Sequence, residues 1–185
     1  MIPPALLLFL ALTITVYVLA GGIVLRWFLR RWCWRDLPRF DGTGVRELNG
    51  DCVPVQVRGE TVWIAGVAAD SEARAKAALG NVPPAGLTVF LAHSPDTISV
   101  IAHENVDLCC CGHMHGGQIA LPLYGALIAL TRTGKAFEAG LYRVGQTWLY
   151  INRGLGMEGG SLPRMRFCAC PELTLIDLAP GPSAP

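Results

Sequence analysis

Two short apolar runs separated by a helix-like segment constrain this chain more than any other feature. Residues Leu87–Ala92 and 106–111 are mostly apolar and short enough to be buried strands, and residues 95–105 between them suit a helix. A strand, a helix and a second strand in this order predict a parallel pair. His93 and His113 follow the two strands directly, so we expect both imidazoles at one edge of a sheet, where α/β proteins bind ligands.

A histidine pair follows the second strand. His113 and His115 are two residues apart, and in extended backbone this spacing lets both rings face one ligand. With His93 they predict a metal site, because neutral imidazole is a common ligand of zinc, manganese and iron. A bare His-x-His pair is also found among surface and capped core histidines. His103, on the expected helix beside Glu104, is interpreted as a solvated surface residue.

Three glycines frame this histidine pair. We expect Gly112 to end the strand by adopting backbone angles that a side chain would oppose. Gly116 and Gly117 should let the backbone and a ligand approach each other closely. The segment therefore predicts a loop shaped for ligand binding at the end of a strand.

Consecutive cysteines offer alternatives to histidine chemistry. In a strand, Cys109 and Cys111 face one side and Cys110 the other, so no pair has the geometry of a Cys-x-x-Cys zinc site. A cysteine nucleophile paired with a histidine would need an exposed thiol, whereas this strand is expected to be buried. We interpret these cysteines, with Cys168 and Cys170, as packing residues. Seven cysteines, an odd number, favour a reducing compartment over a disulfide scaffold.

The N-terminal segment 5–25 is almost wholly apolar and carries no charged residue. As a helix it would span roughly 30 Å, the thickness of a bilayer's hydrocarbon core, so we predict a transmembrane helix. A cleaved signal peptide is the alternative, but no basic side chain precedes the segment. Five arginines within residues 26–39 predict a single-pass membrane protein with a cytosolic C-terminal body. The tryptophans among them suit an anionic membrane surface, and an ordinary stop-transfer flank is the alternative.

The remaining pattern predicts a single folded body. The net charge is only +1, so the sequence does not predict the basic surface that binds nucleic acid. We expect an anchor and basic segment over residues 1–40, one domain over residues 41–178 and a disordered tail over residues 179–185. The further expected elements are a hairpin of residues 53–57 and 61–67 with Pro54 on an edge strand, a helix over 70–79, a hairpin of 136–144 and 146–152, and a last strand over 172–178.

Several motifs follow one another in order: Leu91-Ala92-His93-Ser94-Pro95-Asp96, the segment from Asp107 to Gln118, Gly140-Leu141-Tyr142, Asn152-Arg153-Gly154-Leu155-Gly156 and Pro171-Glu172-Leu173-Thr174-Leu175. Together they resemble the C-terminal half of the calcineurin-like metallophosphoesterases, particularly the bacterial membrane-anchored branch, over residues 44–178. The resemblance implies an α/β fold, a two-sheet sandwich flanked by helices, here preceded by one transmembrane helix. It also implies a two-metal centre that activates water to attack a phosphate ester.

The resemblance assigns roles to individual residues. His93 and His113 would bind the second of two divalent ions, which are Mn, Fe or Zn, and His115 would bind the first. The three glycines would shape the loop. Arg153 is a candidate phosphate contact, with an ordinary loop arginine as the alternative. No catalytic residue is assigned. A membrane position makes a lipid-linked or nucleotide-sugar phosphodiester a plausible substrate.

The N-terminal motifs of that family have no counterpart in this chain. They comprise an Asp-x-His, a Gly-Asp whose aspartate bridges both metals, and an Asn-His-Asp or Asn-His-Glu. Two neighbouring cations repel each other unless anionic ligands offset them, and three neutral histidines supply none. We therefore expect at most one weakly held metal and impaired hydrolysis by this chain alone.

Two functional classes remain open from the sequence. The first is a membrane-anchored phosphoesterase whose missing ligands come from another chain or from Asp70, Asp96 or Asp107. The second is a non-catalytic remnant or interaction module. Half of a sandwich would also leave apolar sheet surface uncovered, which favours self-association.

Overall fold

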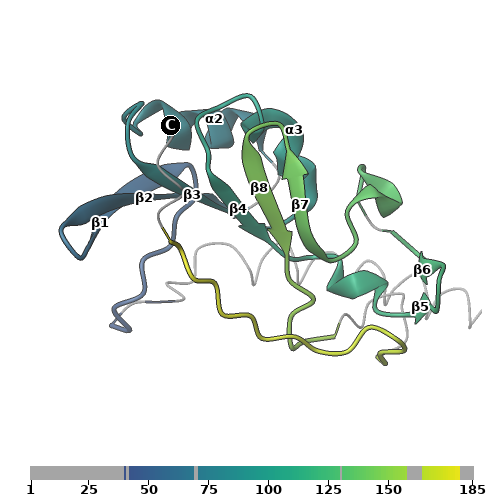
Figure 1. Cartoon of the computed structure of the whole chain (residues 1–185). Coiled ribbons are helices and arrows are strands. Elements are labelled where there is room, and N and C mark those ends of the chain that lie inside the picture. The colour runs from purple at the N-terminus through teal and green to yellow at the C-terminus, as the bar shows by residue number, and fades with distance from the viewer. Residues whose placement is uncertain (1–39, 41, 69–70, 130, 158–163, 180–185) are drawn as a thin grey trace, which may run out of the picture. The chain divides into compact units, whose positions relative to one another are not determined.

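A mixed sheet of six strands is the main element of the fold (Figure 1). The computed structural model describes residues 40, 42–68, 71–129, 131–157 and 164–179. The chain divides into two compact units, Met1–Glu47 and Leu48–Pro185, and the helices and strands of the described residues all lie in the second. The strands are β1 Asp51–Val57, β2 Glu60–Val67, β3 Leu87–Ala92, β4 Leu108–Cys111, β5 Ala120–Leu121, β6 Gly125–Ala126, β7 Gly140–Val144 and β8 Thr147–Ile151. The helices are α2 Glu72–Gly80 and α3 Ile98–Ile101, with 3₁₀ turns η1 Pro95–Thr97, η2 His115–Gly117 and η3 Gly134–Ala136.

The strands lie in the order β1-β2-β3-β4-β8-β7, and β5 pairs with β6 in a separate small sheet. The four inner strands are parallel, whereas β1 and β7 are antiparallel edges. Both predicted hairpins and the parallel pair of β3 and β4 are confirmed. Pro54 lies on edge strand β1, where a missing N–H is tolerated. Because β3 and β4 are parallel, the loops that follow them meet at one edge of the sheet.

Helices α2 and α3 cover one face of the sheet, which we call the helix face. Phe90 of β3 lies in register with Ala65, Cys109 and Leu149 on the neighbouring strands, and these four side chains are buried. Successive side chains alternate across a strand, so this row points to one side. The row packs against the buried helix residues Ala75, Ala78, Ile98 and Ile101. Apolar burial therefore fixes the helices on this face.

The opposite face, which we call the second face, is partly open. Leu91 shares a row with Cys110 and Tyr150, and Trp148 lies one row away. Leu91 is 43% exposed and Trp148 is 45% exposed. Parallel strands carry apolar residues on both faces because both are normally covered. Within the described ranges, part of this apolar face remains uncovered.

Three sequence predictions about the fold differ from the structure. The helix expected over 95–105 is only η1 and α3, and the chain then turns, with the Asn105 side chain bonded to the carbonyl of Pro84. Residues 172–178 form no strand, and Leu173 and Leu175 are exposed. A second large sheet is not formed by the described residues. A mixed α/β sheet with few helices still fits a metallophosphoesterase-like fold.

The prediction of a single-pass membrane protein is wrong by the structural criterion. Across the described ranges, no helix is long and apolar enough to span a bilayer. The segment 5–25 and the arginine-rich segment after it, on which the prediction rested, lie outside the described residues. Apolar composition alone suggested the span, and the described helices α2 and α3 are short.

Candidate functional site

His93 and His113 lie side by side at the edge of the sheet where β3 and β4 end. Their ring centroids are 4.5 Å apart, with the ring planes tilted by 44°. The backbone joins the two loops as well, because the Gly112 amide donates to the carbonyl of His93 at 3.2 Å. The parallel register thus brings together two histidines that are twenty positions apart in the chain.

The turn after β4 is held in an unusual backbone conformation. His113 has a φ of 68° and His115 a φ of 49°, in the left-handed region that side chains normally avoid. Gly112, by contrast, does not have a positive φ, so the expectation that it supplies special backbone angles is wrong. The strain falls instead on the histidines, and strained non-glycine backbone is concentrated at functional sites.

Gly116 and Gly117 are in close contact with neighbouring segments of the protein. Each has a positive φ, and a Cβ on Gly117 would lie 2.2 Å from the Cβ of Ala126 on β6. A Cβ on Gly116 would lie 3.2 Å from the side chain of Arg153. The turn is therefore pressed between β6 and Arg153, and side chains at these glycines would push them apart.

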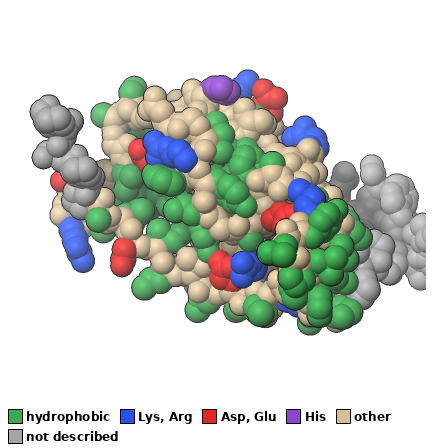
Figure 2. Space-filling model, turned by 45° about the vertical axis from the view of Figure 1, so that its right-hand side comes forward, with side chains coloured by type: hydrophobic (Ala, Val, Ile, Leu, Met, Phe, Trp, Pro, Cys, Tyr) green, Lys and Arg blue, Asp and Glu red, His purple; other side chains and the backbone are tan. Residues whose placement is uncertain are grey.

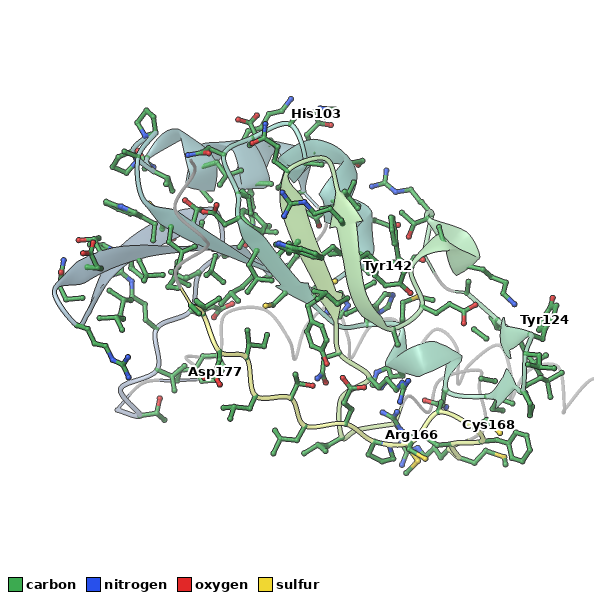
Figure 3. All side chains as sticks on the ribbon, viewed as in Figure 1. His103, Tyr124, Tyr142, Arg166, Cys168 and Asp177 are labelled. Atoms are coloured by element: carbon green, nitrogen blue, oxygen red, sulfur yellow. The ribbon has the colours of Figure 1, made fainter. Side chains whose placement is uncertain are left out.

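Arg166 holds the other side of this turn (Figure 3). Its guanidinium donates to the carbonyls of Arg153 at 2.8 Å and Ala169 at 3.0 Å, and also to those of Gly154 and Gly156. It further contacts the carbonyl of His115 at 3.3 Å and the ring Nδ1 of His115 at 3.0 Å. Sequence reasoning missed Arg166, since a loop arginine fifty-one positions from its partner gives no local signal.

The contact with Arg166 favours one tautomer of His115. A guanidinium can only donate, so Nδ1 of His115 accepts the hydrogen bond. The proton of the neutral ring then lies on Nε2, which leaves no lone pair there for a metal. In this arrangement His115 is suited to donate a hydrogen bond rather than to ligate a cation.

A polar network anchors the C-terminal segment beside the same loop. The Tyr150 hydroxyl is bonded to the carboxylate of Glu172 and to Thr174, and the Asn152 side chain reaches Thr174 at 3.1 Å. The Tyr150 hydrogen bond, with Thr174 and the Arg153 guanidinium 3.6 Å away, lowers the pKa of Glu172 although partial burial opposes this. Arg153, the candidate phosphate contact, is thus at the turn but already faces a carboxylate.

Curated relatives match about half of this chain. It is 44% identical over 91 residues to the uncharacterized metallophosphoesterase YkuE of Bacillus subtilis, covering 49% of this chain and 30% of that protein. It is 41% identical over 90 residues to the phosphodiesterase YaeI of Escherichia coli, covering 49% and 32%. It is 35% identical over 95 residues to the UDP-2,3-diacylglucosamine pyrophosphatase LpxG of Chlamydia trachomatis, covering 48% and 28%. No protein-family model and no solved structure matches the chain.

The matches lie in the C-terminal half, which contains the histidine turn. The matched half is similar to metallophosphoesterases, which confirms the resemblance that its motifs predicted. The chain spans about a third of the length of these relatives.

The side chains present do not fit the two-metal centre of a metallophosphoesterase. Among the residues that the structure describes, no three histidine, cysteine, aspartate or glutamate side chains are grouped so that they could hold a metal ion. His93 and His113 are adjacent, but His115 is engaged by Arg166. Three neutral imidazoles also supply none of the negative charge that two cations require.

Asp96 and Asp107, considered as substitute metal ligands, are both bonded to backbone amides. Asp96 is buried and accepts hydrogen bonds from the amides of Arg132 and Thr133, both at 2.9 Å. Burial by itself would raise the pKa of Asp96, but these bonds outweigh it and hold the pKa below its ordinary value. Asp107 precedes β4, so it lies at the opposite sheet edge from His113, and its carboxylate accepts from the amide of Thr88. Asp70 is outside the described residues.

The thiols of Cys109 and Cys110 on β4 are not activated as nucleophiles. A hydrogen bond to Cys111 and burial raise the pKa of Cys109, and burial raises that of Cys110, so the nucleophilic thiolate is disfavoured.

Cys168 and Cys170 are exposed, so their interpretation as packing residues is wrong. They were expected to pack because cysteine is usually buried, but they flank the buried Ala169 and face outward. His103 is exposed, as predicted, and lies far from Arg166 in Figure 3.

Proposed function

We propose that this chain contributes the histidine half of a metal-dependent phosphoesterase centre and hydrolyses phosphate esters poorly by itself. The observation that supports this most strongly is the pairing of His93 and His113 at the ends of two parallel strands. His115 and the framing residues Gly112, Gly116 and Gly117 belong to the same loop.

Poor hydrolysis follows from the charge of the donor set. The histidines can hold at most one divalent ion, Mn, Fe or Zn, and only weakly, because His115 is engaged by Arg166 and no carboxylate offsets the positive charge. The remaining ligands would come from a second chain. We assign no bond-breaking step to the residues present.

The substrate is proposed to be a phosphoester with a lipid portion. One relative is named for a pyrophosphatase acting on a diacylated sugar nucleotide, which supports an amphiphilic substrate for this chain. Arg153 lies over the histidine turn, and its guanidinium could move from Glu172 to a substrate phosphate.

Turnover of bis(p-nitrophenyl) phosphate by the full chain with Mn²⁺ tests this proposal. We expect hydrolysis near the uncatalysed background, with the same rate for His113→Asn, which tolerates a positive φ. Binding of inorganic phosphate should nevertheless be strengthened by Mn²⁺, and this gain should vanish in His113→Asn. Rapid Mn²⁺-dependent turnover that His113→Asn abolishes would contradict the proposed impairment.

A non-catalytic interaction module is the second candidate. The bond from Arg166 to Nδ1 of His115 favours it, because that bond turns a metal ligand into a hydrogen-bond donor. Phosphate binding that is indifferent to Mn²⁺ would support this module over the half-centre.

We also propose that the second face of the sheet associates with a copy of the chain. Leu91 and Trp148 are exposed apolar side chains on it. Sedimentation velocity should show a concentration-dependent dimer that Trp148→Lys weakens and that Ala77→Lys, on the exposed side of α2, leaves unchanged. A monomer at all concentrations would refute the association.

A further inference from the structure

The hairpin after the histidine turn presents apolar side chains to solvent. We name as the apolar lobe the exposed residues Leu121, Leu123, Tyr124, Leu127, Ile128 and Phe167. Leu123 at its tip is 110% exposed. Figure 2, which brings the β5–β6 side of the molecule forward, shows hydrophobic side chains gathered low on that side. A group of this kind beside a polar site is typical of a binding surface.

Hydrogen bonds tie the backbone of the lobe to neighbouring segments. Leu127 donates to the carbonyl of Ile119 at 3.0 Å, and Ala120 donates to Phe167 at 2.9 Å. The Ala126 amide donates to the carboxylate of Glu138 at 2.9 Å. Because its polar backbone groups are bonded inward, the lobe exposes its apolar side chains while keeping a defined shape.

The lobe adjoins the histidine turn directly. Ala126 of β6 is fully buried and lies so close to Gly117 that no side chain fits between them. On the other side of the lobe, Phe167 donates its amide to Gln118 at 2.9 Å, and Gln118 ends the same turn. The lobe is therefore continuous with the histidine turn through these two contacts.

Two cationic side chains lie beside this surface, and each is also close to a carboxylate. The Lys135 ammonium lies 3.3 Å from the centre of the Tyr124 ring and donates to the Tyr124 carbonyl at 2.6 Å. Arg153 lies on the other side of the turn, with its side chain against Gly116. Lys135 lies 3.6 Å from the carboxylate of Glu138 and Arg153 lies 3.6 Å from that of Glu172, so an anionic head would bind by displacing these carboxylates.

We infer that the apolar lobe binds the acyl chains of a phosphoester whose phosphate lies at His93 and His113. This inference rests on the proposed phosphoester site and adds a second contact region to it. The lobe determines specificity for acylated substrates, because burying apolar chain atoms on it strengthens binding without adding any contact to the phosphate.

Binding of two probes to the full chain tests the inference. The probes are dioctanoyl phosphatidic acid, kept below its micelle concentration, and glycerol 3-phosphate, which has the same head and no acyl chain. We expect the diacyl probe to bind at least about tenfold more tightly, since burial of one aliphatic side chain's worth of surface is sufficient for that factor. The double variant Leu123→Ser and Leu127→Ser should remove this advantage and leave glycerol 3-phosphate unchanged.

Leu175→Ser provides the matched control, because Leu175 is 90% exposed but lies outside the lobe. It should not alter binding of either probe. Equal affinity of the wild-type chain for both probes would overturn the lobe and leave the phosphoester site standing. Lobe-dependent binding that His113→Asn does not weaken would overturn both. A ligand-free dimer that the double variant dissociates would overturn the inference in favour of a second copy of the chain.

Discussion

Leu149 and Leu91 lie on inner strands of the same sheet, but their surroundings differ. Leu149 is fully buried on the helix face, whereas Leu91 is 43% exposed on the second face. The strands thus carry apolar residues for two covered faces, and the described helices cover one. The helix face therefore supplies most of the stability of this domain, whereas apolar side chains on the second face can pack against another molecule.

Replacing each of the two leucines by alanine tests this difference between the faces, and it has the largest expected effect on stability. Leu149→Ala should lower the free energy of unfolding by about 2–5 kcal/mol, because it leaves a cavity in the core. Leu91→Ala should cost about 1 kcal/mol or less, since part of its surface is already in water. Urea unfolding followed by circular dichroism measures both. Equal losses would mean that the second face is as well packed as the helix face.

The buried carboxylate of Asp96 provides a second test on the helix side. It joins η1 to residues 132 and 133 through two amide hydrogen bonds, so Asp96→Asn should cost about 1–3 kcal/mol. Its lowered pKa means that the stabilisation is fully present above the unfolded pKa of about 3.9 and is lost as pH falls through the folded pKa. Unfolding measured between pH 7 and pH 3 should therefore be less acid-sensitive in Asp96→Asn. Glu60→Gln, at the exposed β1–β2 turn, serves as the control. An unchanged pH dependence in Asp96→Asn would contradict this role.

A change in the C-terminal segment, which is bonded to Tyr150 on the second face, should have the smallest effect. Glu172→Gln weakens the bond from Tyr150 and should cost about 0.5–1 kcal/mol. Hydrogen exchange should become faster for the Glu172 amide, which is bonded to the carbonyl of Gly154, with no change in β3 or β4. Global destabilisation as large as that of Asp96→Asn would show that this segment belongs to the core.

Most of the sheet could be predicted from the sequence because its signals are local. Alternation, turn residues and the order of apolar runs predicted the β1–β2 hairpin, the parallel pair β3–β4 and the β7–β8 hairpin. The strand expected over 172–178 also alternates, but a strand requires a partner, and pairing is not a local property. The residues of the candidate site also differ in whether local sequence signals predict them. His93 and His113 follow predictable strand ends, whereas Arg166 reaches His115 through a loop whose path no periodicity describes.

Local reasoning also placed the strain on the wrong residue. Gly112 was expected to have unusual backbone angles because glycine adopts them at no steric cost. The structure has positive φ at His113 and His115, which flank the buried Met114, and β6 closely approaches the neighbouring Gly117. Such overrides come from tertiary contacts and are absent from the sequence pattern.

Metal stoichiometry tests the central claim most directly. Equilibrium dialysis of the full chain against Mn²⁺, followed by elemental analysis, should give at most one ion per chain, weakly held and lost in His113→Asn. Two tightly held ions per chain would contradict the account, because three neutral histidines without a carboxylate cannot offset the repulsion between them.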